Sequence, residues 1–152
     1  MENTNNIETG RCQCGKVYYS FPRKKVISAH HCHCKDCQRI TGSGKATIVF
    51  VSKKNIEIKG DLKYYETKGS SGMNIRRGFC INCGSGVLSY AKELSRIMFI
   101  KAGTLDNSDW IKIESNFFTK SASHWSKPDN TIESFKENPG LMKNIKTLLK
   151  SF

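Results

Sequence analysis

The sequence predicts a mainly β fold with one short helix. Two observations lead to the strands and a third leads to the helix. Short runs of strand-forming or alternating residues recur through most of the chain. Glycine-containing turns separate many of these runs, as is typical of an all-β fold. Helical spacing of apolar residues is seen in the tail, where Leu141, Ile145 and Leu148 have lysines between them. We therefore expect many short strands and one short helix, over about residues 141–150.

The first expected strands lie in the N-terminal half of the chain. Residues 17–21 are rich in strand formers. Residues 47–51 are an apolar run with the length of a buried strand, and residues 55–59 alternate between polar and apolar side chains. A glycine-containing turn then leads to a returning strand over residues 62–65.

The remaining expected strands lie between residue 87 and residue 118. Residues 87–90 and 97–102 are two further apolar runs of strand length. Residues 110–114 alternate between polar and apolar side chains, and residues 117–118 continue a sheet after them. We expect the strands to form one domain that spans residues 1–152, a length that suits a single domain.

Composition narrows the class of protein. With 38% apolar and 10% aromatic residues, the chain is neither disordered nor fibrous. No apolar run approaches the roughly 20 residues of a membrane-spanning helix. The polar start also lacks the apolar stretch of a secretory signal. We therefore expect a cytoplasmic protein in a reducing compartment, with no membrane partner.

Seven cysteines in a reducing compartment indicate metal binding or catalysis rather than disulfides. Zn²⁺ prefers four ligands in a tetrahedron. A CxC pair on an extended segment places both thiols on one side, and a CxxC pair in a tight turn does the same. Two such pairs can therefore close one structural zinc site, the alternative being free or redox-active thiols. This four-cysteine cluster consists of Cys12, Cys14, Cys80 and Cys83.

The other three thiols, Cys32, Cys34 and Cys37, form a three-cysteine cluster within six residues. They can occupy three corners of a tetrahedron and leave the fourth corner to water or a ligand sulfur, as in a catalytic zinc site. Strand alternation predicts that His33 points away from this site. Two alternatives stay open: His30 fills the fourth corner and makes the site inert, or the thiols hold no metal.

Around these cysteines the sequence resembles the glutathione-dependent formaldehyde-activating enzyme family, which includes the centromere protein V-like domains. Segments 10–17, 32–38 and 79–85 carry the resemblance, with their cysteine order of CxC, CxCxxC and CxxC. Segments 102–106 and 118–125 support it. Together these segments cover about residues 8–140.

The resemblance implies a β-tent fold of mostly antiparallel sheets clipped by zinc. It implies two zinc ions per chain, a structural one in the four-cysteine cluster and a second, catalytic one in the three-cysteine cluster, which can be partly occupied. This sequence departs from the family pattern at Ser115-Asn116, where a histidine is expected. It departs again at Ser123-His124, where a proline often precedes Trp125.

The family's activity joins formaldehyde to glutathione and gives S-hydroxymethylglutathione. This reaction is classed as carbon–sulfur lyase chemistry. The resemblance therefore implies a zinc-dependent lyase-type enzyme. Its substrate would be an adduct of glutathione, or another small anionic thiol, with formaldehyde or another small carbonyl. Metal coordination lowers the pKa of a thiol and can position its sulfur for addition to a carbonyl carbon.

Charged and titratable residues near the clusters are candidates for substrate binding and proton transfer. The candidate proton carriers are His31, His33 and Asp36. Cations would favour the two carboxylates of glutathione, the alternative for each being a solvated surface charge. The candidate cations are Lys35, Arg39, Arg76 and Arg77.

The alternative function is a non-catalytic zinc-binding module that contacts nucleic acid or protein. The net charge of +12, from 25 Lys+Arg against 13 Asp+Glu, attracts phosphates in general. The lysines are scattered along the chain, however, and the clusters lack the Cys₂His₂ spacing of a DNA-reading finger. We therefore favour a small anionic thiol over nucleic acid as the partner.

Overall fold

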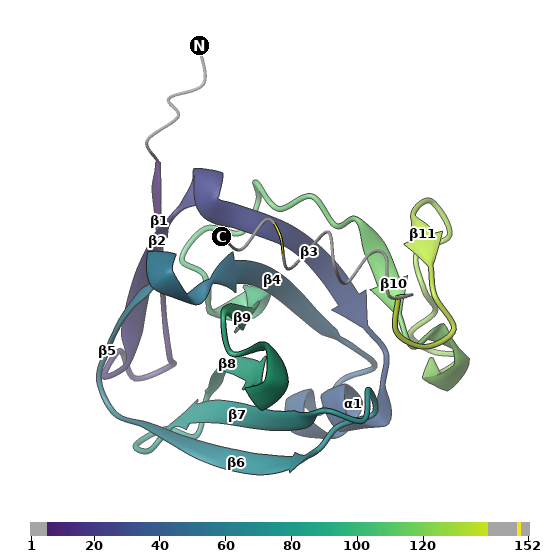
Figure 1. The fold of residues 1–152 in the computed structure, drawn as a ribbon, viewed down its shortest axis with the longest axis horizontal. Coiled ribbons are helices and arrows are strands. Elements are labelled where there is room, and N and C mark those ends of the chain that lie inside the picture. Colours follow the sequence, from purple (N-terminus) through teal and green to yellow (C-terminus); the bar gives the residue numbers. More distant parts are fainter. Residues whose placement is uncertain (1–5, 140–148, 150–152) are drawn as a thin grey trace.

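The computed structural model describes residues 6–139 and residue 149, and within this part the strands form two sheets (Figure 1). One sheet has eight strands in the order β11-β10-β3-β4-β9-β8-β7-β6, and the other has three in the order β1-β2-β5. The strands are β1 (Ile7–Arg11), β2 (Tyr18–Pro22), β3 (Val26–Cys32), β4 (Ala46–Ser52), β5 (Glu57–Lys59), β6 (Leu62–Lys68), β7 (Asn74–Cys80), β8 (Gly86–Ala91), β9 (Ile97–Lys101), β10 (Ser115–Phe117) and β11 (Glu133–Ser134). The helices are α1 (Lys35–Thr41) and the 3-10 turns η1 (Arg23–Lys25), η2 (Lys53–Asn55), η3 (Lys92–Leu94), η4 (Ala102–Thr104) and η5 (Thr119–Ser121).

The expectation of a mainly β fold is confirmed. Antiparallel pairing predominates, and β10 is the exception because it pairs in parallel with both β3 and β11. Expected strands 17–21, 47–51, 62–65, 87–90 and 97–102 correspond to β2, β4, β6, β8 and β9. The expected helix over residues 141–150 lies outside the described residues, apart from residue 149. None of the helices in the described part of the chain has the length and apolar character needed to cross a bilayer.

The expected strand over residues 110–114 is wrong. These residues belong to no ladder, although the Glu114 N–H donates to the Ala29 carbonyl at 2.9 Å. Trp110, Ile111 and Ile113 are partly buried and pack against the main core, so their apolar character reflects burial rather than strand pairing. The strand that follows, β10, begins at residue 115.

Sequence reasoning missed β1, β3, β7, β11 and α1. β7 escaped notice because charged side chains interrupt its apolar pattern, and α1 is too short for a helical period to show. Local chemistry sets both ends of α1. The Cys34 sulfur accepts the Cys37 N–H at its start, and Gly42 ends it with a φ of 64°.

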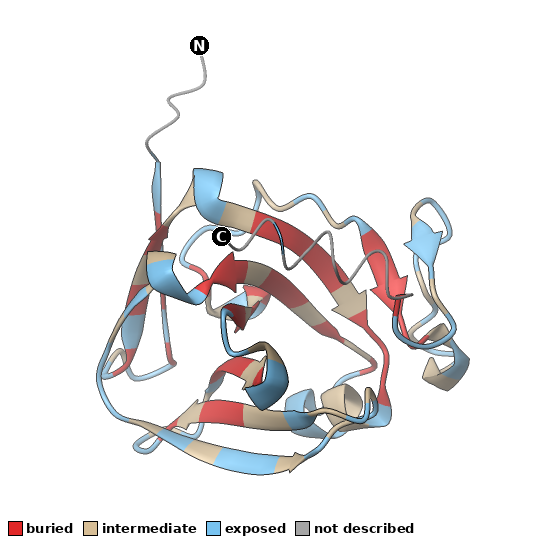
Figure 2. Ribbon diagram, viewed as in Figure 1, coloured by how far each residue is buried: buried red, intermediate tan, exposed pale blue. Residues whose placement is uncertain are grey.

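The eight-stranded sheet is apolar on both faces at its centre, as β4 illustrates. Val49 and Val51 point into the main core, which also contains Tyr19 and Phe21 of the three-stranded sheet. Ile48 and neighbouring Phe50 point the other way, into a second apolar cluster that includes cysteines. Figure 2 shows the buried segments along β3, β4 and β10, whereas edge strand β6 has none. The central strands are therefore covered on both faces, as their continuous apolar runs predict.

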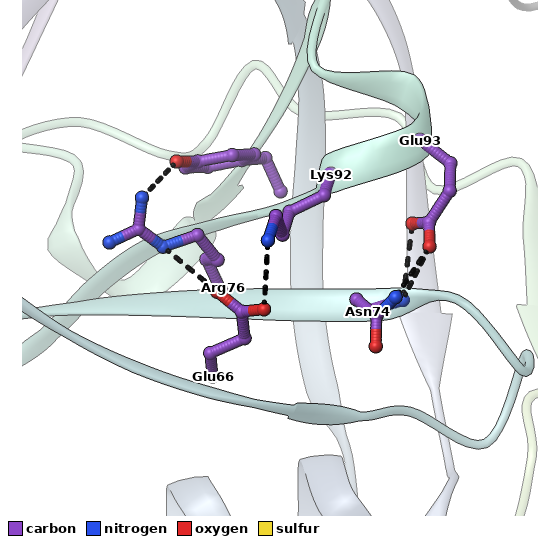
Figure 3. A network of polar contacts seen from close by, with 6 residues as sticks. Glu66, Asn74, Arg76, Lys92 and Glu93 are labelled. Carbon is purple, nitrogen blue, oxygen red and sulfur yellow. Dashed lines mark hydrogen bonds and ion pairs between the residues drawn. The ribbon is translucent and has the colours of Figure 1, made fainter.

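A polar network fastens edge strand β6 to β7 and to the turn after β8 (Figure 3). The Arg76 guanidinium lies 4.7 Å from the Tyr64 ring centroid and donates to the Tyr90 hydroxyl at 3.0 Å. The Glu66 carboxylate pairs with Arg76 at 3.5 Å and with the Lys92 ammonium at 3.1 Å. The network thus holds together the strands that carry one wall of the site described next.

Candidate metal centres and the adjoining cavity

The four-cysteine cluster joins the two sheets. Cys12 and Cys14 lie in the turn after β1, and Cys80 and Cys83 lie at the turn between β7 and β8. The expected extended CxC segment is thus a turn, and its geometry resembles that of the CxxC turn. Each turn is followed by a glycine with positive φ, 77° at Gly15 and 76° at Gly84. An L side chain is strained at such angles, so both turns depend on glycine to bring their thiols together.

The sulfur distances fit a tetrahedral metal site. Cys12 Sγ lies 3.6 Å from Cys14 Sγ, which lies 3.8 Å from Cys80 Sγ. All four sulfurs lie within 4.8 Å of one another. Four sulfurs at about 2.3 Å from one zinc ion would be about 3.8 Å apart. The cluster is therefore compatible with zinc, and four thiolates would leave no position for a substrate.

A serine links the two turns of this cluster. The Ser85 hydroxyl accepts the Gln13 N–H at 3.0 Å and lies 3.2 Å from Cys83 Sγ. Its hydrogen bond is the main reason why the pKa of Cys83 falls to about 5. A thiol with a low pKa is readily available as a thiolate ligand.

The three-cysteine cluster is built where a strand meets a helix. Cys32 ends β3, Cys34 caps α1 and Cys37 lies in the first turn of α1. Their sulfurs lie within 4.8 Å of one another. Hydrogen bonds with Cys32 and Cys37 lower the pKa of Cys34, whereas hydrogen bonds with Cys34 and Cys37 raise the pKa of Cys32. The three thiols are therefore arranged to share negative charge, and the donor set is compatible with zinc.

Neither nearby histidine completes this cluster within the described residues. Both ring nitrogens of His30 face serine hydroxyls at 2.8 Å, Nδ1 that of Ser115 and Nε2 that of Ser28. The cluster of ligand atoms around Cys32 includes three sulfurs and no histidine nitrogen. The alternative in which His30 fills the fourth corner is therefore not supported by this geometry. His33 is completely buried, and burial lowers its pKa.

A cavity of about 350 Å³ opens beside the three-cysteine cluster. Its floor is the face of the eight-stranded sheet opposite the main core. Strand register places its side chains in two neighbouring rows. The row nearer Cys32 consists of Ser115, His30, Ile48 and Lys101, and the next consists of Ser28, Phe50, Phe99, Ser89 and Arg77. All three cysteines of the cluster line this cavity, whereas none of the four-cysteine cluster is among its described lining residues.

One of the four candidate cations lines the cavity. Arg77 does, with its Nη2 atom 3.6 Å from an Asp36 carboxylate oxygen. Arg76 points to the opposite face of β7, into the network of Figure 3, because neighbouring side chains on a strand alternate. Lys35 and Arg39 are exposed on α1. Sequence reasoning missed Lys101, which lines the cavity from β9; only the pairing of β9 with β4 reveals it.

Of the three candidate proton carriers, neither His31 nor His33 is among the described residues that line the cavity. Asp36 lines the cavity and accepts a hydrogen bond from the Ser70 hydroxyl at 3.3 Å. His31 lies outside it, with Nδ1 2.9 Å from the Thr47 hydroxyl. Burial, reinforced by Lys45, lowers the pKa of His31 to about 4. Asp36 is therefore the candidate that shares a cavity with the thiols.

The departures from the family pattern have distinct positions. Ser115 lines the cavity and binds His30, so a hydroxyl orients a histidine that stands on the neighbouring strand. Asn116 is buried and its Nδ2 donates to the Asp129 carbonyl at 2.8 Å and to the Ser134 hydroxyl at 3.0 Å. Trp125 is 64% exposed and is not among the described lining residues of the cavity.

The two sheets and two thiol clusters, one of which opens into a cavity, define a β protein with cysteine clusters that could hold metal ions. Within that class the chain belongs to the glutathione-dependent formaldehyde-activating enzyme family, whose model matches residues 7–121, more than half of the chain. Membership connects the protein broadly with glutathione-dependent activation of formaldehyde.

The fold is also similar to one in a solved structure. The crystal structure of a Rhodobacter sphaeroides protein, a structural genomics target, matches with a TM-score of 0.52 and 19% sequence identity. The match covers 65% of this chain and 88% of the other. At this identity the likeness concerns the fold alone. A comparison with curated proteins found no match.

Proposed function

We propose that the protein is a zinc-dependent lyase-type enzyme that makes and breaks the carbon–sulfur bond between a small carbonyl and an anionic thiol. Glutathione is the proposed thiol, and formaldehyde or another small carbonyl is the proposed partner. One observation carries the proposal: the cluster with three thiols, and hence an open fourth position, is the one that lines the cavity. The closed four-thiol cluster lies elsewhere and fits a structural role.

The two clusters are proposed to hold one zinc ion each. In the three-cysteine cluster the metal, when bound, would lower the pKa of a substrate thiol and so supply a thiolate. Seven free cysteines among the described residues suit a reducing compartment, and we place the protein in the cytoplasm on that basis.

The cations of the cavity are proposed to bind and orient the thiol. Arg77 and Lys101 line the same cavity as the cysteines and can pair with substrate carboxylates. Asp36 holds the Arg77 guanidinium in place across 3.6 Å. Cationic side chains near a partly enclosed site also raise the local concentration of an anionic substrate.

Proton movement is proposed to use Asp36 and Ser70. Addition of a thiol to a carbonyl forms a carbon–sulfur bond, and the proton lost from sulfur ends on the carbonyl oxygen. The Ser70 hydroxyl donates to the Asp36 carboxylate at 3.3 Å, and both residues line the cavity. This pair can receive the thiol proton and return it to the new hydroxyl group.

The test combines metal content with exchange kinetics. The wild-type protein should contain about two zinc ions per chain and should accelerate exchange between formaldehyde and its glutathione adduct, measured by NMR. Cys37→Ser should retain the fold by circular dichroism, lose one zinc and lose the acceleration. Arg39→Ala, an exposed change on the same helix, is the matched control and should keep both.

Two results would contradict the proposal. Full zinc content in Cys37→Ser would show that the three-cysteine cluster is not the second metal site. Two bound zinc ions without any acceleration of exchange would favour the non-catalytic module. Retention of DNA or RNA at physiological salt would then identify nucleic acid as its partner.

A further inference from the structure

Much of the cavity floor is aromatic. Phe50 and Phe99 are cross-strand partners on β4 and β9, with ring centroids 4.6 Å apart, and both are half-buried. Phe117 stacks on His30 at 4.3 Å, and the His30 ring meets the Phe50 ring edge-on at 5.0 Å. The rings form one continuous surface across four neighbouring strands, β10, β3, β4 and β9.

The Phe50–Phe99 part of this surface lies further along the sheet from Cys32 than Phe117, which is in register with that cysteine. Phe50 is in register with Ser28, which precedes Cys32 by four residues on β3. Four residues of a strand span about 13 Å. The carbon of formaldehyde would lie one covalent bond from the substrate sulfur, and that sulfur is expected at the cysteine cluster. Formaldehyde would therefore leave Phe50 and Phe99 without a partner.

The same surface suits the peptide part of glutathione poorly. Amide, carboxylate and ammonium groups lose water when they cover phenylalanine rings, and this is costly unless they gain hydrogen bonds. The nearby polar side chains are turned toward one another: each His30 nitrogen already faces a serine hydroxyl at 2.8 Å. The charged groups that match glutathione, Arg77 and Lys101, flank this surface: Arg77 ends the row that contains Phe50 and Phe99, and Lys101 follows Phe99 by two residues on the same face of β9.

We propose that the carbonyl substrate carries an apolar arm, aromatic or branched aliphatic, that lies on the Phe50–Phe99 surface. This inference rests on the proposed function and names the class of its carbonyl partner. The thiol sulfur adds to the aldehyde carbon, and its proton ends on the former carbonyl oxygen. The product is a hemithioacetal, and the reverse reaction releases the aldehyde and the thiol. A cavity of about 350 Å³ is of the size that accommodates such an adduct.

The test measures binding of two stable thioethers by calorimetry to the zinc-loaded full-length protein. S-benzylglutathione carries an apolar arm, and S-methylglutathione carries one carbon. S-benzylglutathione should bind about 30-fold more tightly, since burial of an aromatic side chain stabilises by roughly that factor. Phe99→Ala should remove most of this preference. Tyr64→Ala, which deletes an aromatic ring outside the described cavity lining, should leave the ratio unchanged.

Two other binding results would overturn the apolar-arm proposal. Equal affinity of the two thioethers would overturn the apolar-arm proposal and leave the proposed function in place. Absence of binding by both would count against glutathione as the thiol and would overturn both proposals. Should Phe99→Ala fail to fold, Phe50→Leu replaces it, and the wild-type ratio tests the proposal in any case.

Discussion

Single residues decide which face of a strand carries the site. Arg76 and Arg77 are adjacent in the sequence, yet one packs between two tyrosines outside the cavity and the other lines it. The direction of the Cys34 side chain also matters, because its sulfur both caps α1 and belongs to the three-cysteine cluster. The chemistry of the site therefore depends on side-chain direction as much as on residue type.

Tyr19 provides a pH-dependent prediction at the residue scale. Its side chain is buried, its hydroxyl lies 2.8 Å from that of Thr104, and burial raises its pKa above the ordinary value of about 10. Above pH 10 the unfolded chain releases the phenolic proton while the folded protein keeps it. The free energy of unfolding should therefore fall as the pH rises above 10.

Urea unfolding between pH 8 and pH 11 would measure this effect. Tyr19→Phe should cost about 1 kcal/mol at pH 8, where one hydrogen bond is lost. That cost should shrink above pH 10, because only the wild-type protein is destabilised by phenol ionisation. A cost that stays constant over the whole range would show that Tyr19 titrates normally in the folded state.

At the scale of the element, strands place side chains from distant parts of the sequence beside one another. β3 presents Ser28, His30 and Cys32 on one face because alternate residues of a strand share a face. β7 holds Arg77 in the cavity wall and is itself tied to edge strand β6 by the network of Figure 3. The position of a cavity cation thus depends on contacts made on the other side of its strand.

Arg76 and Lys92 allow this network to be tested by a matched pair. Arg76→Ala removes a hydrogen bond to Tyr90, an ion pair with Glu66 and contacts with two rings, and should lower the free energy of unfolding by about 1–2 kcal/mol. Lys92→Ala removes a half-exposed ion pair with Glu66 and should cost less than about 0.5 kcal/mol. Chemical denaturation measures both, and equal costs would contradict the central role of Arg76.

At the scale of the whole molecule, the four-cysteine cluster connects the two sheets. Cys12 and Cys14 follow β1 of the three-stranded sheet, whereas Cys80 and Cys83 flank the turn from β7 to β8 of the eight-stranded sheet. The three-cysteine cluster joins β3 to α1 alone, within six residues of sequence. Loss of metal should therefore affect stability very differently at the two sites.

Cys12→Ser should lower the melting temperature by about 10 °C or more, because a lost structural metal costs several kcal/mol and each kcal/mol shifts a chain of this length by roughly 2–4 °C. Cys37→Ser should lower it by much less. Thermal unfolding with zinc content measured in parallel separates the two effects. Equal shifts would contradict the assignment of the four-cysteine cluster as the structural site.

By itself, the sequence was enough to predict which cysteines come together and most of the strands. Cysteine spacing is local, so CxC, CxCxxC and CxxC predict which thiols can meet before any fold is known. Runs of strand formers are local too, which is why β2, β4, β8 and β9 were expected. The strand expected over residues 110–114 was wrong because an irregular segment that packs against the core also carries apolar residues among polar ones.

Only the tertiary structure decided the shape and lining of the cavity. Its floor combines side chains from β10, β3, β4, β9, β8 and β7, and their order in the sheet differs from their order in the sequence. The pairing of β9 with β4 brings Lys101 and Phe99 into the cavity, and the pairing of β10 with β3 gives His30 its Ser115 partner. Such contacts depend on strand register between distant segments, which no local pattern encodes.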